Sequence, residues 1–319
     1  MKQRRSRVAV VAIAALAAIA VPALSACGSP LAIPDTKGAN KLEVVASFYP
    51  LQFATQQIGG DHVVVANLTR PGVEPHDIEL TPREVASVSK ARLVVYERGL
   101  QGAVDKAVES EAGNRGLDVA PAANLDMLFQ PAFGAPTPAP GTNAPGTTDP
   151  HFWLDPQRYS AVATVIAERL SVLDPANKVD YTNNAKAFED KLAALNGVLE
   201  AGLANCWRKD IVTSHAAFGY LARRFGMVQI AINGLSSEQE PRAAVLAAVS
   251  TYARAHDVTT IYAETLVSPA IAQTVARESG AHMATLDPIE GLTATSLGKD
   301  YFEVMRSNLK ALQAGQGCS

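Results

Sequence analysis

Three histidines and one aspartate of this 319-residue sequence are candidate ligands for a metal ion. His76 lies in the turn-rich segment PGVEPHD, His151 lies between two prolines in DPHFWLDP, and His215 follows the apolar segment IVTS. Asp287 follows an expected strand and precedes a proline. Imidazole and carboxylate groups are ligands for borderline metals such as Zn²⁺, so these four side chains could complete a four-coordinate site.

The spacing of the four candidates excludes a compact zinc-finger motif. They are separated by 75, 64 and 72 residues, so the fold would have to bring them together. Glu264 also follows an expected strand. It could compete as a ligand, but we expect it to hydrogen-bond a ligand histidine instead. We interpret the other three histidines as structural or exposed: His62, His256 and His282.

The sequence contains no common catalytic motif. It has no GxSxG, Walker A, GxGxxG or HExxH segment, and the adjacent Ser214 and His215 cannot form a Ser/His pair. A hydrolytic zinc needs an open coordination position for water, which three histidines and an aspartate would fill. We therefore expect no enzyme activity. The alternative is a zinc-dependent extracellular hydrolase with Glu264 as its general base.

The elements that must position these side chains alternate between strands and helices. We expect strands at 42–48, 63–68, 92–96, 210–214, 228–232, 259–263 and 282–286. We expect helices at 50–58, 81–90, 101–111, 156–173, 216–225, 241–256, 269–279 and 299–314, the second with Thr81 as N-cap and Pro82 at its first position. This alternation predicts parallel sheets covered by helices, whose strands end at the edge where ligands bind.

A long helix is predicted over 174–203, and at 1.5 Å per residue it could span two lobes. The predicted fold is thus α/β, with an N-terminal lobe at 41–173 and a C-terminal lobe at 204–319. The uncharged Pro/Gly-rich segment 131–148 predicts a mobile surface loop.

The N-terminus has the features of an export signal. Basic residues precede an apolar run at 8–21, and Leu24-Ser25-Ala26-Cys27 resembles a bacterial lipobox. We expect residues 1–26 to be a lipoprotein signal peptide, Cys27 to carry the lipid anchor to the cell membrane, and 27–40 to be a flexible tether. The alternative is a plain secretory signal in which Cys27 is incidental. Either signal predicts an extracytoplasmic protein.

The composition is that of a globular domain. Hydrophobic residues make up 48% and charged residues 18%, with a formal net charge of −3, so no basic excess indicates a nucleic-acid partner. Three cysteines exclude a disulfide-dense scaffold. If Cys27 is lipidated, Cys206 and Cys318 remain as an even pair in an oxidising compartment. We expect a disulfide between them; the alternative is two free buried thiols.

Six segments together resemble the metal-specific solute-binding proteins of ABC transporters, the cluster A-I zinc and manganese receptors. The segments, spread over about residues 42–315, are VVASFYP (44–50), PHDIELTP (75–82), DPHFWLDP (149–156), TSHAAFGYLARRFG (213–226), SEQEP (237–241) and LDP (286–288). The resemblance implies two α/β lobes joined by a long rigid helix, with metal in the cleft. It also implies ligand roles for His76 and His151 from the first lobe, and for His215 and Asp287 from the second.

The resemblance implies a monomeric, high-affinity zinc receptor that delivers Zn²⁺ to an ABC permease, with a metallochaperone as a further partner. Zinc receptors resemble this chain in having His at the third ligand position, His215, where manganese receptors have Glu. A manganese-type receptor of the same family is the nearest alternative, and some relatives are described as adhesins. Many zinc receptors carry a His-rich loop before the second ligand, whereas 131–148 contains no histidine.

Overall fold

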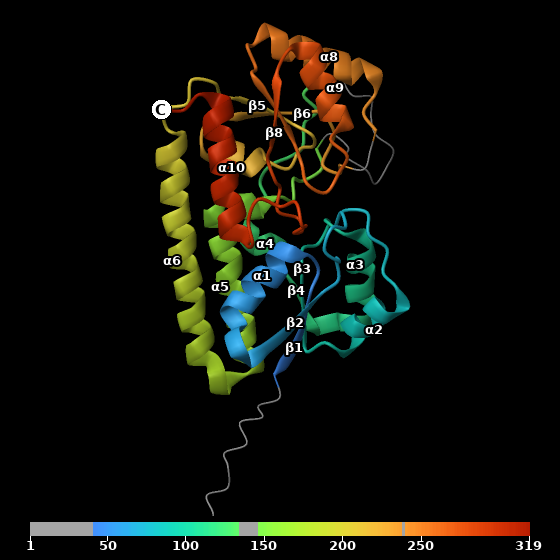
Figure 1. The fold of residues 1–319 in the computed structure, drawn as a ribbon. Coiled ribbons are helices and arrows are strands. Elements are labelled where there is room, and N and C mark those ends of the chain that lie inside the picture. Colours follow the sequence, from blue (N-terminus) through green and yellow to red (C-terminus); the bar gives the residue numbers. More distant parts are fainter. Residues whose placement is uncertain (1–40, 134–145, 238–239) are drawn as a thin grey trace, which may run out of the picture. The chain divides into compact units, whose positions relative to one another are not determined.

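The computed structural model describes residues 41–133, 146–237 and 240–319 (Figure 1). The expected signal peptide at 1–26, the lipidation site Cys27 and the tether at 27–40 lie outside the described residues, as does most of the loop 131–148. Within the described ranges, no helix is both long and apolar enough to cross a membrane.

Two four-stranded parallel sheets form the centres of two lobes. The first has the order β2-β1-β3-β4, from β1 (Leu42–Ala46), β2 (Val63–Asn67), β3 (Leu93–Tyr96) and β4 (Gly116–Asp118). The second has the order β6-β5-β7-β8, from β5 (Asp210–Thr213), β6 (Val228–Ala231), β7 (Thr260–Ala263) and β8 (His282–Thr285). The predicted two-lobe α/β fold is confirmed, and only the short β4 was not predicted. Because both sheets reverse their strand order beside the first strand, each has a ligand-binding edge where its strands end.

Helices follow the strands much as predicted. They are α1 (Tyr49–Gly59), α2 (Pro82–Lys90), α3 (Gly102–Ala107), which continues as a π-helical turn, α4 (Ala120–Ala123), α5 (Pro156–Leu173), α6 (Lys178–Leu203), α7 (Gly219–Arg224), α8 (Ala243–Ala255), α9 (Ala270–Ser279) and α10 (Tyr301–Gln316). The start of α2 is confirmed, since Thr81 and Glu84 form a capping box around Pro82. That cap fixes the end of the loop that follows β2.

Helix α7 begins three residues later than predicted. The backbone N–H of His215 donates to Glu264 Oε1 (3.0 Å), and that of Ala216 donates to the carbonyl of Gly234 (2.8 Å). These two groups are therefore held by neighbouring segments of the lobe. Helical structure starts only at Gly219, after this bend.

The long helix α6 contacts both lobes through one apolar stripe. Its buried residues recur every three or four positions: Tyr181, Ala185, Phe188, Leu192, Leu195, Leu199 and Leu203. Val179, near the start of the helix, does not belong to this stripe and is 70% exposed. The helix has 26 residues, which at 1.5 Å per residue gives about 39 Å. It runs beside α5 and α10 along its length (Figure 1).

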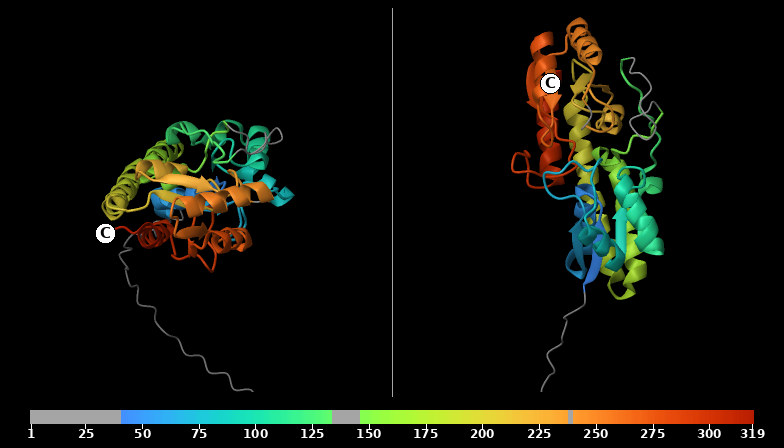
Figure 2. Two further views of the ribbon diagram at one scale, coloured as in Figure 1. Left: turned by 90° about the horizontal axis from the view of Figure 1, so that it is seen from above. Right: turned by 90° about the vertical axis from the view of Figure 1, so that its right-hand side faces the viewer.

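An aromatic cluster joins α6 to helices from both ends of the chain. The ring of Phe188 on α6 lies 5.9 Å from Phe53 on α1 and 5.7 Å from Phe302 on α10. Tyr159 on α5 lies 4.9 Å from Tyr301 on α10. In Figure 2 the blue and teal segments make up one lobe, the orange and red segments the other, and α6 passes along both. Because its apolar stripe is buried against helices of both lobes, α6 is a packed part of the core.

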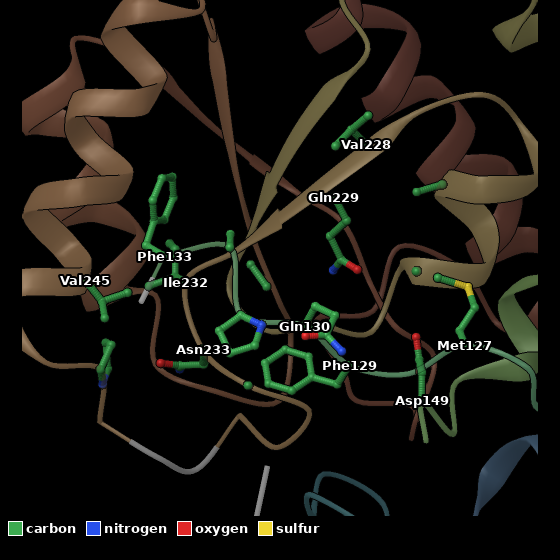
Figure 3. Close-up of a pocket in the computed structure, with 18 of the residues that line it drawn as sticks. Met127, Phe129, Gln130, Phe133, Asp149, Val228, Gln229, Ile232, Asn233 and Val245 are labelled. Atoms are coloured by element: carbon green, nitrogen blue, oxygen red, sulfur yellow. The ribbon is translucent and has the colours of Figure 1, made fainter. Parts of the chain in front are cut away.

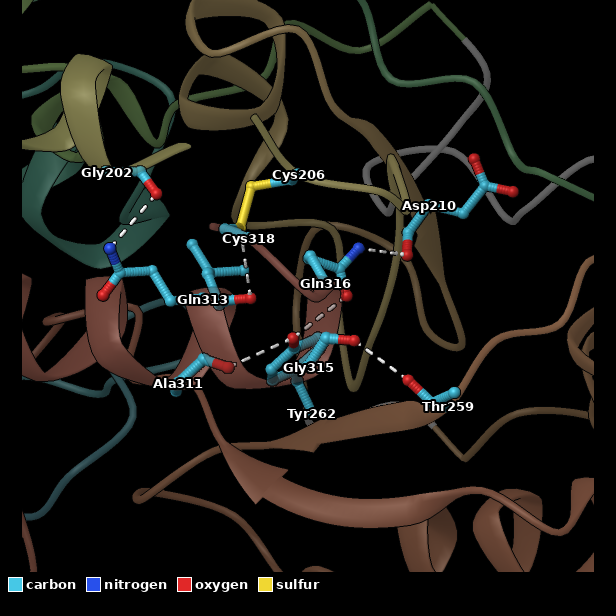
Figure 4. The surroundings of a disulfide bond; sticks show 11 residues. Gly202, Cys206, Asp210, Thr259, Tyr262, Ala311, Gln313, Gly315, Gln316 and Cys318 are labelled. Atoms are coloured by element: carbon cyan, nitrogen blue, oxygen red, sulfur yellow. Dashed lines mark hydrogen bonds between the residues drawn. A yellow bond between two sulfur atoms is a disulfide. The ribbon is translucent and has the colours of Figure 1, made fainter. Parts of the chain in front are cut away.

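The predicted disulfide between Cys206 and Cys318 is confirmed (Figure 4). Cys206 follows α6 and Cys318 follows α10, so the bond closes a separation of 112 residues. Beside it, Gln313 Nε2 donates to the carbonyl of Gly202 (3.2 Å) and Gln316 Nε2 donates to that of Asp210 (2.7 Å). The C-terminal helix is thereby fastened to the end of α6 and to the start of β5.

We predict that removing this disulfide lowers stability without removing the fold. For a loop of this length, the chain-entropy model gives an upper limit of roughly 5 kcal/mol. A double Cys206→Ser/Cys318→Ser variant should therefore melt up to about 10 °C below the parent in calorimetry. Reductant should lower the melting temperature of the parent and leave that of the variant unchanged. Two free thiols in the unfolded, unreduced parent would contradict the bond.

Candidate metal centre

Three histidines and one glutamate meet between the two lobes. His76, His151, His215 and Glu290 offer ligand atoms that all lie within 4.8 Å of one another. Glu290 Oε1 lies 3.3 Å from His76 Nε2, 3.2 Å from His151 Nε2 and 3.2 Å from His215 Nε2. The three predicted histidines are therefore brought together, and each turns the same ring nitrogen toward one carboxylate.

The four side chains come from four separate segments. His215 follows β5 and Glu290 follows β8, both at the carboxyl ends of strands in the second sheet. His76 lies in the loop from β2 to α2, in the first lobe. His151 is the exception to our expectation that all ligands follow strands, because it immediately precedes the short 3₁₀-helix Phe152–Leu154 before α5.

Two of the histidines follow the same local pattern, an acid, a proline and then the histidine. The backbone N–H of His76 donates to Glu74 Oε1 (2.8 Å), and that of His151 donates to Asp149 Oδ1 (2.9 Å). A side chain that accepts from the backbone two residues later closes a tight turn. These acids therefore fix the backbone from which each imidazole projects.

Carboxylates also hold the outer nitrogens of two imidazoles. Asp149 Oδ1 lies 2.8 Å from His151 Nδ1, and Glu264 Oε2 lies 2.7 Å from His215 Nδ1. Such a partner keeps the proton on Nδ1 and leaves the lone pair of Nε2 for a metal. Glu264 therefore stands where we expected it, against a histidine, and Asp149 is a second such partner that we did not predict.

The structure does not bring Asp287 to the three histidines. Asp287 Oδ1 accepts from the backbone N–H of Ile289 (2.8 Å), and Asp287 Oδ2 accepts from Thr265 Oγ1 (3.0 Å). Both oxygens thus support the chain that leads to Glu290. The carboxylate beside the histidines is that of Glu290, three residues further on, and its Oε2 has no partner among the described residues.

The turn that presents Glu290 is held in a rare backbone conformation. Ile289 has a φ of 60°, which is uncommon for a β-branched residue and costs free energy. Its backbone is held by Asp287, and Trp153 Nε1 donates to the carbonyl of Pro288 (2.7 Å). Asn308 on α10 bonds to both the N–H and the carbonyl of Asp287. Strain held in this way by its surroundings is typical of a functional site.

Buried charges shift the pKa values of two of these imidazoles upward. Burial alone lowers the pKa of His215, but the carboxylates of Glu264 and Glu290 outweigh it and raise this pKa well above its ordinary value. The pKa of His151 is also raised, because its bonds with Asp149 and Glu290 outweigh its burial. Without metal, these imidazoles tend to hold protons.

The pKa values of His76 and Glu290 are lowered, and that of Glu74 is raised. Burial lowers the pKa of His76 below the ordinary imidazole value. Burial alone would raise the pKa of Glu290, but the three imidazoles, His215 most strongly, bring it well below the usual range. Burial, with the charge of Glu290, raises the pKa of Glu74 to about 8. Glu290 is thus an ionised carboxylate surrounded by imidazoles.

A cavity of about 670 Å³ is lined by Asp149 but by none of the four residues of the His/Glu group (Figure 3). Asp149 lines one end of it and Phe133 the other. The ring of Phe133 packs against Tyr252 on α8, with centroids 5.5 Å apart. The segment that leads into the loop 131–148 therefore lies against the second lobe.

Comparison with known families shows to which family the chain belongs. The family described as "Zinc-uptake complex component A periplasmic" (ZnuA) matches residues 44–315. The chain belongs to the ZnuA family. The match includes every residue of the His/Glu group.

Individual members of the ZnuA family are similar over most of this chain. The high-affinity zinc uptake system protein ZnuA of Bacillus subtilis is 35% identical over 299 residues, which is 91% of this chain and 92% of that protein. The zinc-binding lipoprotein AdcA of Streptococcus pneumoniae is 36% identical over 279 residues, 86% of this chain. The present chain spans only 55% of the length of AdcA.

Solved structures in the ZnuA family share the fold. The Zn(II)-bound ZnuA-like domain of S. pneumoniae AdcA matches with a TM-score of 0.70 and 35% identity, covering 86% of this chain and 99% of that one. The laminin-binding protein Lmb of Streptococcus agalactiae, described as having adhesin and metal-transporting activity, matches with a TM-score of 0.74 and 30% identity, at 86% and 99% coverage.

We predict that Glu290 contributes far more to zinc affinity than Asp287 does. Glu290→Gln replaces an anionic oxygen by a neutral one beside three imidazoles, and should weaken zinc binding by about 100-fold or more. Asp287→Asn retains an acceptor for the turn and should weaken binding by less than about tenfold. Competitive titration against a chelator measures both. The opposite order would return the ligand role to Asp287.

We predict that zinc affinity rises with pH through neutrality. Because the metal-free protein keeps a proton on His215 above the ordinary imidazole pKa of ~6.5, zinc must displace that proton. The apparent dissociation constant should fall by about tenfold per pH unit for each proton released. Glu264→Gln removes the charge that holds this proton and should flatten the dependence near neutral pH. An affinity independent of pH from 6.5 to 8 would contradict this view.

Proposed function

We propose that this protein is an extracytoplasmic receptor that captures Zn²⁺ between its lobes and delivers it to an ABC permease. The observation that carries the proposal is the convergence of three imidazole nitrogens and one carboxylate oxygen within 4.8 Å. His76, His151, His215 and Glu290 are the proposed ligands. Relatives named for zinc uptake and zinc binding support the same cargo.

The donor set favours zinc over manganese. Zinc is commonly bound by four ligands in a tetrahedral arrangement and accepts imidazole readily, whereas manganese suits sites rich in oxygen ligands. This centre offers three nitrogens and one carboxylate. Copper binds nitrogen-rich sites more tightly than zinc, so the cargo in the cell also depends on which metal is available.

We propose a receptor rather than an enzyme because the centre leaves no room for hydrolytic chemistry. Four ligands would fill the coordination shell that a hydrolytic zinc leaves open for water. Glu264, the candidate general base, has both oxygens engaged by His215, one by the backbone N–H and the other by Nδ1. Members of the ZnuA family that resemble this chain are named for binding and uptake.

The test combines binding and uptake. The protein without residues 1–26 should bind one Zn²⁺ much more tightly than Mn²⁺ in competitive titration. The full chain should restore growth in low zinc to a strain that lacks its own zinc receptor. His215→Ala should lose both properties, whereas His282→Ala, an exposed histidine outside the group, should keep them. Failure of the wild-type protein to bind zinc, or a preference for manganese, would refute the proposal.

The anchor is a separate part of the proposal, supported by the lipobox and by the name of the lipoprotein AdcA. A lipid on Cys27 would hold the receptor at the outer face of the membrane, near its permease. We expect the wild-type protein to enter the detergent phase in phase separation. The Cys27→Ala variant should remain unprocessed or appear in the aqueous phase. Equal partitioning of the two mature proteins would contradict lipidation.

A further inference from the structure

His76 differs from the other proposed ligands in how it is held. The side chains of His151, His215 and Glu290 are completely buried, whereas that of His76 is 8% exposed. His76 also lies on the long loop between β2 and α2. A metal can leave only when ligands withdraw, so the ligand that is most exposed to solvent is the one best placed to move.

Within its own lobe, the loop of His76 is held by a buried glutamine. Gln101 Nε2 donates to the carbonyl of Pro75 (3.1 Å) and to Thr69 Oγ1 (2.9 Å). Thr69 Oγ1 donates in turn to the carbonyl of Ser47 at the end of β1 (2.8 Å). These bonds tie the loop to its own sheet but do not connect it to the second lobe.

Two serines from the second lobe hold the same loop from across the cleft. Ser237 Oγ donates to Glu74 Oε2 (2.6 Å), and Ser236 Oγ donates to Asp77 Oδ2 (2.8 Å). Both serines are buried and follow β6. The two acids stand on either side of His76, so a pair of hydrogen bonds brackets this ligand.

Glu74 connects the serine to the ligand directly. Its Oε1 accepts from the backbone N–H of His76 while its Oε2 accepts from Ser237. The position of the His76 backbone therefore depends on a residue of the opposite lobe through one carboxyl group. Separation of the loop from the second lobe must break this bond together with the one between Ser236 and Asp77.

We propose that Ser236 and Ser237 are positioning residues for His76, and that with Asp77 and Glu74 they form an inter-lobe latch that sets the rate of zinc release. The latch rests on the proposed function, because it acts on the departure of the captured metal. The serines themselves do not bind zinc. They hold the loop in the position from which His76 Nε2 reaches the other ligands.

Loss of the latch should change the rate of zinc release more than the rate of zinc capture. Removing the hydroxyls should accelerate release much more than it slows capture, because the unlatched loop still carries every ligand. The double variant Ser236→Ala/Ser237→Ala loses two hydrogen bonds between the loop and the second lobe at once, so it should release zinc about 10- to 100-fold faster. The association rate should change by less than about threefold.

The experiment mixes the zinc-loaded protein, without residues 1–26, with excess chelator in a stopped-flow instrument. Each single variant should show a smaller acceleration than the double variant, and Ser237→Thr, which keeps a hydroxyl, should release zinc near the wild-type rate. Ser250→Ala is the matched control, since Ser250 is another buried serine of the same lobe that bonds to a carboxylate, Glu278 (3.2 Å), away from the centre. Thermal melting checks that each variant is folded.

Different results of this experiment would refute the latch and the proposed function. If the wild-type protein binds no zinc, the proposed function fails and the latch fails with it. If the wild-type protein binds zinc but the double variant releases it at the wild-type rate, the latch alone is refuted. Equal acceleration by Ser250→Ala would also refute the latch, because the effect would then be a general loosening of the lobe.

Discussion

A completely buried carboxylate, that of Glu290, is the group on which the centre depends. A charge buried in this way is costly unless partners surround it, and here three imidazoles converge on one of its oxygens. Two of those imidazoles are held from behind by further carboxylates, Asp149 and Glu264. The centre thus consists of alternating carboxylates and imidazoles, and each group compensates for the burial of its neighbours. The three ring nitrogens and the carboxylate oxygen lie within 4.8 Å of one another, which is a donor set that suits a divalent cation.

The scaffold that holds this carboxylate extends to the end of the chain. The turn before Glu290 is bonded to Asn308 on α10, and α10 approaches β7 closely at Gly315, where a Cβ would lie 2.1 Å from the hydroxyl oxygen of Tyr262. Beyond that point, the disulfide between Cys206 and Cys318 fastens α10 to the end of α6. A covalent bond far from the metal ligands therefore belongs to the same packed unit as the strained turn at Ile289.

The proposed ligands differ in how firmly the structure holds them. Glu290, His151 and His215 lie on segments packed against the core, which favours a preformed site and tight binding. His76 lies on a loop that Gln101 holds to the first lobe and that Ser236 and Ser237 hold to the second. The long helix α6, packed against α5 and α10, limits the movement of whole lobes, so movement of one loop is the less costly route to release.

The features that depend on local pattern and residue chemistry were predictable from the amino-acid sequence. Alternating strand and helix signals gave the two-lobe fold, the Thr81-Pro82 cap gave the start of α2, and the even cysteine pair gave the disulfide. The three histidines were recognisable from their loops and from the family resemblance. The acid-Pro-His pattern at Glu74 and Asp149 was also present in the sequence as a signal, although its meaning became clear only from the hydrogen bonds.

The choice between Asp287 and Glu290 could not be made from the sequence and required the folded chain. Both carboxylates lie in one short stretch after β8, and the one that faces the histidines depends on the left-handed backbone at Ile289, which a β-branched residue rarely adopts. That conformation exists because Asp287, Trp153 and Asn308 hold the turn from distant segments. The bonds from Ser236 and Ser237 to the loop of His76 are likewise contacts between residues about 160 positions apart, which no local pattern encodes.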